Sequence, residues 1–352
     1  MKRSYITLLA VLIFALLLTG CGNQAVKTAK TTEKNEEVNV YTARHYPGID
    51  DAIYQTFTQQ TGIKVNLIKA SGEELLQRIK TEGAGSKADV YFTADAGNLY
   101  LAKEAGILQP MRSDLLNKNI PENFRDVDHM WVGLTMRARV LVYAKERVKP
   151  EELSTYEALT SPKWAGKVLV RSSNNIYNKS MLAALIEING ETQAKEWAKG
   201  IVVNMARKPE GGDRDQALAV AAGVGDVAIM NTYYLGQMLN SKDPAEVKAA
   251  QQLAVFFPNQ SSTGVHINVS GAGIVKTAKN PENAKKLLEF LSEAAAQKAF
   301  AEASTEYPAN PSVEPSALLK SWGAFKPQNI NLSKLGEHNK KASLIFNEIG
   351  WK

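Results

Sequence analysis

Residues 38–68 read VNVYTARHYPGIDDAIYQTFTQQTGIKVNLI, and this stretch decides the fold. Val38 to Tyr41 has the short apolar pattern of a strand, and 50–61 has the amphipathic spacing of a helix. Gly62 ends that helix, and 63–68 follows as a second strand. An alternation of strand, helix and strand predicts parallel strands covered by helices, so we expect an α/β fold.

The same alternation continues along the chain. Ser71, with Glu74 three positions later, forms the capping-box pattern that starts a helix. Further strands are predicted at 88–93, 167–170 and 226–230, and further helices at 192–199, 213–222 and 282–303. Two extended runs, 139–143 and 266–275, are candidates for crossovers between two lobes. Because the chain from Val38 onward exceeds one typical domain in length, we expect two domains.

Residues 1–20 have the pattern of a bacterial lipoprotein signal peptide. A basic start, MKR, precedes an apolar run at 6–18, and Leu-Thr-Gly-Cys at 18–21 closes it. The alternative, a membrane-spanning helix, is disfavoured because the apolar run is short. Cys21 is the only cysteine, so we expect no disulfide within the chain. Its predicted role is to carry lipid that anchors an extracytoplasmic protein to the cell membrane, on its periplasmic or outer face.

Residues 21–37 are predicted to be the lipidated cysteine and a flexible tether, because the segment is rich in Lys, Thr, Asn and Glu and has almost no large apolar residues. The full chain has 42 Lys and Arg against 36 Asp and Glu, and loss of residues 1–20 would reduce the excess from +6 to +4. The lysines are interspersed with glutamates, so nucleic-acid binding is not expected. We expect a monomer.

The tyrosine pair in Asn231-Thr232-Tyr233-Tyr234 suggests metal chemistry. It follows the predicted strand at 226–230, in what reads as a polar loop. A phenol has a pKa near ~10, yet a hard cation can displace its proton and bind the phenolate oxygen. Phenolate suits Fe(III) especially. The alternative is ordinary packing, with one ring inward and the other half exposed.

Several motifs, taken together, resemble those of a known family. They are the Leu-Thr-Gly-Cys signal, Thr61-Gly62-Ile63-Lys64-Val65, and Ala88-Asp89-Val90, which resemble substrate-binding proteins of ABC importers. Three more segments resemble the ferric-iron-binding members: Tyr41-Thr42-Ala43-Arg44-His45-Tyr46, Ser173-Asn174-Asn175-Ile176-Tyr177-Asn178, and Asn231-Thr232-Tyr233-Tyr234. The resemblance runs from about Val38 to residue 352.

The resemblance implies the two-lobed class II periplasmic-binding-protein fold shared with transferrin lobes. Each lobe would be a mixed, mainly parallel sheet flanked by helices, and two crossover strands near Arg137 and His266 would join them. The N-terminal lobe would combine 38–137 with 266–313, and the C-terminal lobe 138–265 with 314–352.

The resemblance also implies a ligand set. The expected iron ligands are His45 and Tyr46 from one lobe, and Tyr177, Tyr233 and Tyr234 from the other. Relatives with a carboxylate ligand place a glutamate where this chain has Ala94, so that ligand is expected to be absent and additional tyrosine to replace it. Asp95 is a candidate ligand or acceptor near the site, and its competing role is to cap the helix that begins at Ala96.

Several phenolates around Fe(III) would need nearby positive charge in a site of low dielectric constant. Arginine suits this role because it stays charged and donates in a fixed geometry. The candidates are Arg44, Arg139, Arg207 and Arg214, each with surface solvation as the alternative. Ser172, Ser173 and Asn231 are candidates to orient a ligand or to hold a synergistic anion such as bicarbonate, phosphate or citrate. Asn231 could instead satisfy the backbone of its own loop.

The resulting functional hypothesis is capture of ferric iron in an interlobe cleft and delivery to an ABC permease and its ATPase. Release would require opening of the lobes, and binding of Fe(II) remains an alternative to Fe(III). No Gly-x-Ser-x-Gly, phosphate-loop or His-Glu-x-x-His motif is found, so an enzyme is not expected. The alternatives are a binding protein for an organic or oxyanion solute and a lipid-anchored hydrolase.

Overall fold

The computed structural model describes residues 36–44 and 50–352, so Cys21, with the predicted signal and most of the predicted tether, lies outside the described residues. The strands are β1 (Glu37–Thr42), β2 (Lys64–Lys69), β3 (Val90–Ala94), β4 (Leu108–Gln109), β5 (Val132–Ala144), β6 (Val168–Leu169), β7 (Val227–Asn231), β8 (Leu253–Phe256), β9 (Ile267–Val275) and β10 (Tyr307–Pro308).

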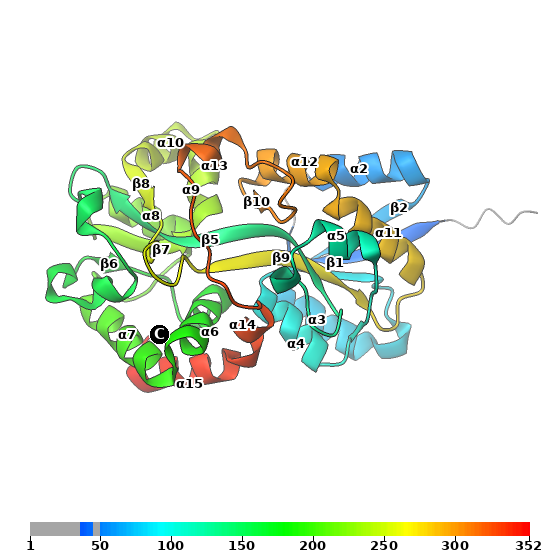
Figure 1. Cartoon of the computed structure of the whole chain (residues 1–352), viewed down its shortest axis with the longest axis horizontal. Coiled ribbons are helices and arrows are strands. Elements are labelled where there is room, and N and C mark those ends of the chain that lie inside the picture. Colours follow the sequence, from blue (N-terminus) through cyan, green and yellow to red (C-terminus); the bar gives the residue numbers. More distant parts are fainter. Residues whose placement is uncertain (1–35, 45–49) are drawn as a thin grey trace, which may run out of the picture. The chain divides into compact units, whose positions relative to one another are not determined.

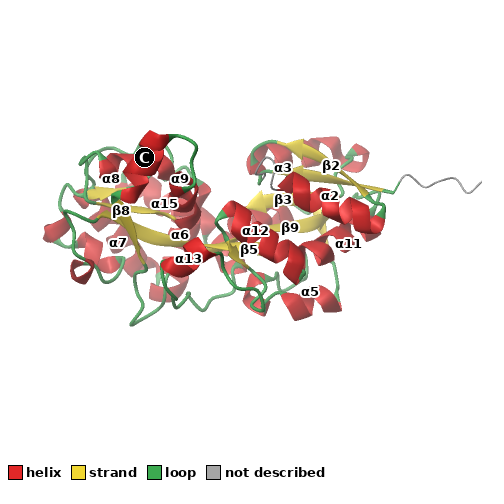
Figure 2. Cartoon of the chain, turned by 90° about the horizontal axis from the view of Figure 1, so that it is seen from above, coloured by secondary structure: helices red, strands yellow, loops and turns green. Residues whose placement is uncertain are grey.

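Helices lie on both sides of these strands (Figure 2). The α-helices are α2 (Asp50–Thr61), α3 (Gly72–Glu82), α4 (Ala96–Glu104), α5 (Asp114–Asn119), α6 (Ile176–Asn189), α7 (Glu191–Asn204), α8 (Asp213–Ala221), α9 (Thr232–Leu239), α10 (Pro244–Gln251), α11 (Pro281–Ser292), α12 (Ala294–Ser304), α13 (Ala317–Ser321), α14 (Ser333–Glu337) and α15 (Asn339–Ile349). Short 3-10 turns lie at Gly83–Gly85, Glu122–Phe124, Pro150–Glu152, Glu157–Thr160 and Pro162–Trp164. Among the described residues, none of the helices combines the length and the apolar character needed to cross a membrane.

The strands follow the order β2-β1-β3-β9-β5-β7-β6, and β5 and β9 run through the middle of this order (Figure 1). The parallel pairs are β1 with β2, β1 with β3, and β6 with β7. The pairs formed by β5 and β9 are antiparallel. The predicted α/β fold with mixed sheets is therefore confirmed. Parallel pairing is found around β1 and between β6 and β7, whereas the crossover strands β5 and β9 run antiparallel to their neighbours.

Strand β5 joins the two halves of the fold. Up to Ala138 it pairs with β9, and from Arg139 onward it pairs with β7. Of its 13 residues only Met136 is not fully buried, which explains the long apolar run in the sequence. The predicted crossovers near Arg137 and His266 lie at this change of partner. The lobe boundaries proposed from the sequence stay a prediction.

Most elements begin and end close to their predicted positions. Helix α2 spans Asp50–Thr61, and Ser71 and Glu74 form both bonds of the predicted capping box. The predicted single helix at 282–303 is wrong, because α11 ends at Ser292 and α12 begins at Ala294. Side-chain amides occupy the carbonyls that a continuous helix would use: Gln297 Nε2 donates to Leu291 O at 2.7 Å, and Asn310 Nδ2 donates to Ser292 O at 3.0 Å.

The segment after 314 contacts both halves of the fold. Helix α14 packs against α4 and α6, and α15 packs against α6 and α7. The contact with α4 is so close that a Cβ added at Gly336 would lie 2.1 Å from Cβ of Tyr100. The Leu332 amide donates to Asn123 O at 3.0 Å. The segment that the resemblance assigns to the C-terminal lobe is therefore bonded to the other half as well.

His266, at the start of the crossover into β9, is buried and neutral. Its amide donates to the Tyr156 hydroxyl at 3.0 Å, and that hydroxyl in turn donates to Arg139 O. Its Nδ1 lies 3.0 Å from Gln328 Oε1. Burial lowers the pKa of His266 to about 3, against a smaller opposing effect of Gln328. The two crossover strands are thus bridged by groups that have no access to solvent protons.

This burial predicts a loss of stability in acid. Between pH 6.5 and about 3 the unfolded imidazole binds a proton and the folded one does not, so stability falls as the pH falls through this window. Urea unfolding at pH 7 and pH 4.5 should show that the wild type loses about 2–3 kcal/mol more than His266→Gln over this interval. His129, which is only half-buried, is changed to Gln as the control and should leave the loss unchanged. Equal losses for all three proteins would contradict this assignment.

Candidate metal-binding site

Tyr177 lies in the first turn of α6. The Asn175 side chain accepts a hydrogen bond from the Tyr177 amide at 2.9 Å and so caps the helix. Of the two asparagines near the tyrosine, Asn175 starts the helix and Asn178 is buried inside it.

Tyr233 and Tyr234 lie in the first turn of α9, so the prediction that they lie in a polar loop is wrong. Strand β7 ends at Asn231, and Thr232 begins the helix without an intervening loop. The polar residues of this junction accept hydrogen bonds from strand β5: Asn231 Oδ1 accepts from Arg139 Nη1, and Thr232 Oγ1 accepts from the Ala138 amide. Tyr233 is buried and Tyr234 is half-buried.

The three tyrosines come together although they arise from two separate helices. The Tyr233 hydroxyl lies 3.2 Å from the Tyr177 hydroxyl. The rings of Tyr233 and Tyr234 have centroids 4.3 Å apart. The structure therefore brings together these three predicted ligands. The other two, His45 and Tyr46, lie outside the described residues, and their role stays a prediction.

Helix geometry favours negative charge at this point. Tyr177 is the second residue of α6, and Tyr233 is the second residue of α9. The start of a helix carries a partial positive charge and amides without intrahelical partners, which stabilise nearby anions. Burial raises the pKa of the Tyr177 phenol, and Tyr234 raises it further, while Arg137 and the hydrogen bond from Tyr233 lower it. A cation must therefore displace a firmly held proton to bind here.

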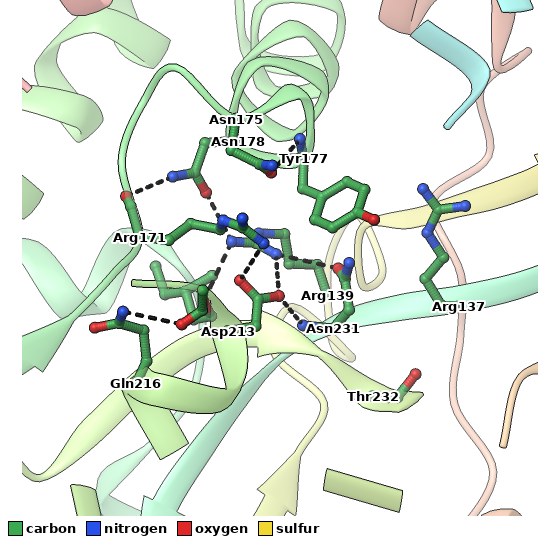
Figure 3. Close-up of polar contacts among 12 residues, drawn as sticks. Arg137, Arg139, Arg171, Asn175, Tyr177, Asn178, Asp213, Gln216, Asn231 and Thr232 are labelled. Carbon is green, nitrogen blue, oxygen red and sulfur yellow. Dashed lines mark hydrogen bonds and ion pairs between the residues drawn. The ribbon is translucent and has the colours of Figure 1, made fainter. Parts of the chain in front are cut away.

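Two arginines flank Tyr177, and neither was among the site residues expected from the sequence. The guanidinium carbon of Arg137 lies 5.4 Å from the ring centroid, and that of Arg171 lies 5.3 Å from it. Figure 3 shows Arg137 and Arg171 near Tyr177. Two weak signals were present in the sequence: Arg171 directly precedes the Ser172-Ser173 pair, and Arg137 is two residues before Arg139 on the same strand.

Arg137 is almost completely buried and only partly hydrogen-bonded. Its Nη2 donates to Asp95 Oδ2 at 3.2 Å, whereas Nε and Nη1 have no hydrogen-bond partner. Burial lowers its pKa, but Asp95, Tyr177 and Tyr233 raise it more, so the group stays charged. A buried cation with unused donors is costly unless it faces a negative group. Phenolates at the neighbouring tyrosines would supply that group.

Asp95 caps α4, the competing role considered for it. Its Oδ1 accepts from the Gly97 amide at 2.7 Å and from the Ser180 hydroxyl at 2.6 Å. Its Oδ2 accepts from Asn268 Nδ2 at 2.9 Å and from Arg137. Burial raises the pKa of this carboxyl, and the charge of Arg137 opposes that effect. Both oxygens are thus occupied by the protein itself.

Arg139 connects the elements that carry the tyrosines (Figure 3). Its Nη1 donates to Asp213 Oδ2 at 3.0 Å and to Asn231 Oδ1 at 3.1 Å. Its Nη2 donates to Asn178 Oδ1 at 2.7 Å. Asn178 is the neighbour of Tyr177, and Asn231 precedes the Thr232-Tyr233-Tyr234 turn. Arg139 therefore fixes the two helix starts relative to strand β5.

The remaining predicted arginines lie in other networks. Arg44 is buried, donates from Nη1 to Asp50 at 2.8 Å and from Nη2 to Glu306 at 3.0 Å. Arg214 contacts Glu246 at 3.0 Å, with 43% of its side chain exposed. The last of them pairs with its near neighbour: Arg207 forms an ion pair with Glu210.

Of the predicted polar residues, the Ser172 hydroxyl accepts from the Asn174 amide at 3.1 Å. The Ser173 hydroxyl donates to Trp351 O at 2.5 Å. Asn231, besides accepting from Arg139, has a buried Nδ2 without a partner. The alternative role of Asn231, a hydrogen bond to the backbone of its own loop, is not seen. Its Oδ1 accepts instead from the side chain of Arg139 on the neighbouring strand.

A cavity of about 380 Å³ lies beside Tyr177. It is lined by Ala43, Ser71, Gly72, Glu73, Thr93, Ala94, Asn98, Asn174, Asn175, Ile176 and Tyr177. These residues come from both halves of the fold, and Ala43 is two residues before His45 in the chain. Within 36–44 and 50–352, no group of three or more His, Cys, Asp or Glu side chains is arranged to hold a metal ion.

Residues 52–327 match the family model for bacterial extracellular solute-binding proteins. The chain belongs to this family. The predicted relationship to substrate-binding proteins is thereby confirmed, as is the extracytoplasmic character of the family. Lipid anchoring at Cys21 stays a prediction.

Relatives within this family have names that refer to iron. The chain is 48% identical to Iron uptake protein A1 of Synechocystis over 98% of this chain and 96% of the relative. A solved Trichodesmium structure, IdiA or FutA in complex with iron and citrate, has a TM-score of 0.88 and 49% identity, and the match covers 90% of this chain and 100% of that one. A ferric binding protein from Campylobacter jejuni has a TM-score of 0.85 and 41% identity, with 90% and 100% covered.

The buried Arg139 predicts a large stability cost when its charge is removed. Arg139→Met removes the closer of the two arginines paired with the buried Asp213 carboxylate and leaves only Arg171 Nη1, at 3.4 Å from Oδ1, which should lower the free energy of unfolding by about 3–5 kcal/mol. Arg78→Met is the control, because Arg78 forms its ion pair with Glu82 with 49% of its side chain exposed. That variant should lose much less stability in the same urea titration, because an exposed ion pair contributes little. Similar losses for both variants would contradict the role of Arg139.

Proposed function

We propose that this solute-binding protein captures Fe(III) through its tyrosine phenolates and delivers it to an ABC permease and its ATPase. The observation that carries the proposal is the convergence of Tyr177, Tyr233 and Tyr234 beside two arginines. Phenolate oxygen is a hard donor that suits Fe(III), and three such donors from two helices form a preorganised part of a ligand shell. The names of the relatives from Synechocystis and Campylobacter jejuni support the same cargo.

The proposed shell is completed by His45 and Tyr46, the two ligands that only the family resemblance suggests. Binding would release the phenol protons, since the metal takes the deprotonated oxygen. Arg137 and Arg171 would balance the resulting negative charge, and the free Nε and Nη1 of Arg137 are donors for it. Asp95 is not proposed as a ligand, because four protein donors already occupy its oxygens.

A small anion is proposed to accompany the iron. The Trichodesmium relative is described with iron and citrate, and the cavity beside Tyr177 offers side-chain amides from Asn98, Asn174 and Asn175 as donors. Closure of the two lobes would deliver ligands from both sides, and opening at the permease would separate them again. A lipid chain on Cys21 would keep the protein at the extracytoplasmic face of the membrane.

The proposal predicts a visible absorption band from phenolate-to-iron charge transfer. Ferric citrate added to the purified protein should give this band, and Tyr177→Phe, Tyr233→Phe or Tyr234→Phe should each weaken it and lower iron retention after desalting. Tyr143→Phe is the control, because Tyr143 pairs with β7 and β8 within the sheet and lies outside this cluster.

A wild-type protein with no band and no retained iron would reject the ferric proposal. Titration with Fe(II) under anaerobic conditions, and then with organic and oxyanion solutes, would follow from that result. A band that keeps its full intensity when all three tyrosines are replaced together would place the iron away from these three phenols.

Arg137 is predicted to contribute its charge to iron binding. Arg137→Gln removes the charge but keeps an amide that can donate to Asp95, so iron affinity should fall by about 10–100-fold while the protein stays folded. Arg214→Gln is the control, since Arg214 contacts Gln237 and Glu246 and has 43% of its side chain exposed. Competition against a ferric chelator measures the iron affinity of both variants. An equal loss of affinity in the two would contradict the role of Arg137.

A further inference from the structure

Trp351, which follows α15, is bonded to both ends of a three-residue segment at the site. Its Nε1 donates to Arg171 O at 3.1 Å, and its own carbonyl accepts from the Ser173 hydroxyl at 2.5 Å. Some 180 residues separate these partners in the chain. A single side chain and its carbonyl thus hold the segment 171–173 from outside.

The tryptophan is itself firmly held. It is buried, with its ring centroid 4.9 Å from that of Phe346 and 6.2 Å from that of Trp197. Its amide donates to Phe346 O at 3.2 Å. Gly350 adopts φ 74°, a left-handed conformation that lets the chain turn back after the helix. The indole is therefore an anchor with little freedom to move.

The segment that it holds carries Arg171, whose guanidinium lies 5.3 Å from the Tyr177 ring centroid. Arg171 Nη1 lies 3.4 Å from Asp213 Oδ1. The Arg171 carbonyl also accepts from Asn178 Nδ2 at 2.8 Å, so the Trp351 indole and a residue of α6 both donate to the same oxygen. Any movement of the segment moves the arginine relative to the phenols.

We propose that Trp351 is a positioning residue for the metal site, which holds 171–173 so that Arg171 stays beside Tyr177 and Tyr234. The inference rests on the proposed function, because its effect is exerted on iron bound by these phenolates. Burial lowers the pKa of Arg171, but Asp213, Tyr234 and Tyr177 raise it more, so the guanidinium stays charged. Trp351 touches no ligand and acts only through the segment.

Displacement of Arg171 would change both the absorption of the bound iron and its rate of release. A guanidinium near a phenolate lowers the energy of the oxygen electrons, so its displacement narrows the gap to the iron orbitals. The charge-transfer band then moves to longer wavelength. Iron release also becomes faster, because Arg171 then balances less of the phenolate charge and Tyr177 is held less rigidly. A residue that only packs the protein would change the melting temperature and leave the band where it is.

The test compares two conservative variants of the full-length protein loaded with ferric citrate. Trp351→Phe removes the indole donor but keeps an aromatic ring, and Ser173→Ala removes only the hydroxyl. Each should shift the band to longer wavelength and raise the rate of iron release to a chelator about three- to tenfold, as expected for the loss of one buried hydrogen bond. Arg171→Gln should shift the band in the same direction and by more.

Trp131→Phe is the matched control, because Trp131 is also buried but directly precedes β5, at the end of that strand that pairs with β9. It should lower the melting temperature without moving the band. If Trp351→Phe fails to fold, the smaller Ser173→Ala variant decides alone. An unchanged band and release rate in the folded variants, beside a clear shift in Arg171→Gln, would overturn the positioning role. A wild type without any band would instead overturn the proposed function, and the inference with it.

Discussion

The buried ion pair between Arg139 and Asp213 is the interaction on which the site depends. Arg139 stands where β5 leaves β9 and joins β7, so its guanidinium is fixed to the strand that connects both halves. From there it holds Asn178 on α6 and Asn231 at the end of β7. Such a pair is costly to bury and costly to break, so it contributes to a defined geometry more than to net stability. The positions of Tyr177 and Tyr233 therefore depend on Arg139 and its ion pair.

A second buried network occupies the other half of the fold. Glu306 accepts from Arg44, from the Thr135 hydroxyl at 2.9 Å and from the Ser270 hydroxyl at 3.0 Å. Thr135 and Ser270 lie on β5 and β9, so the crossover strands are held by a charged group on each side of their junction. The His266 and Tyr156 bridge lies between the two networks. Together they pair buried charges at the crossover, whereas Nε and Nη1 of Arg137, beside Tyr177, have no hydrogen-bond partner.

The extent to which the sequence predicted the structure differed with the kind of feature. The strand at β1, the helix at α2 and the capping box at Ser71 depend on residues close in the chain, and they were predicted closely. The break between α11 and α12 was missed because Gln297 and Asn310 reach their carbonyl partners through the tertiary fold. Arg137 and Arg171 were missed because nothing local distinguishes a buried arginine over a tyrosine ring from a solvated one.

The sequence by itself determined the α/β class, the choice of these tyrosines as candidate ligands, and the family to which the chain belongs. Apolar periodicity, turn residues and short motifs, on which these conclusions depend, are local properties. Only the tertiary structure decided that Tyr177 and Tyr233 begin helices, that their hydroxyls meet at 3.2 Å, and that Arg139 and Trp351 hold the segments around them. These contacts join residues far apart in the chain. Their distances are set by packing and by the pairing of buried charges, which no local pattern records.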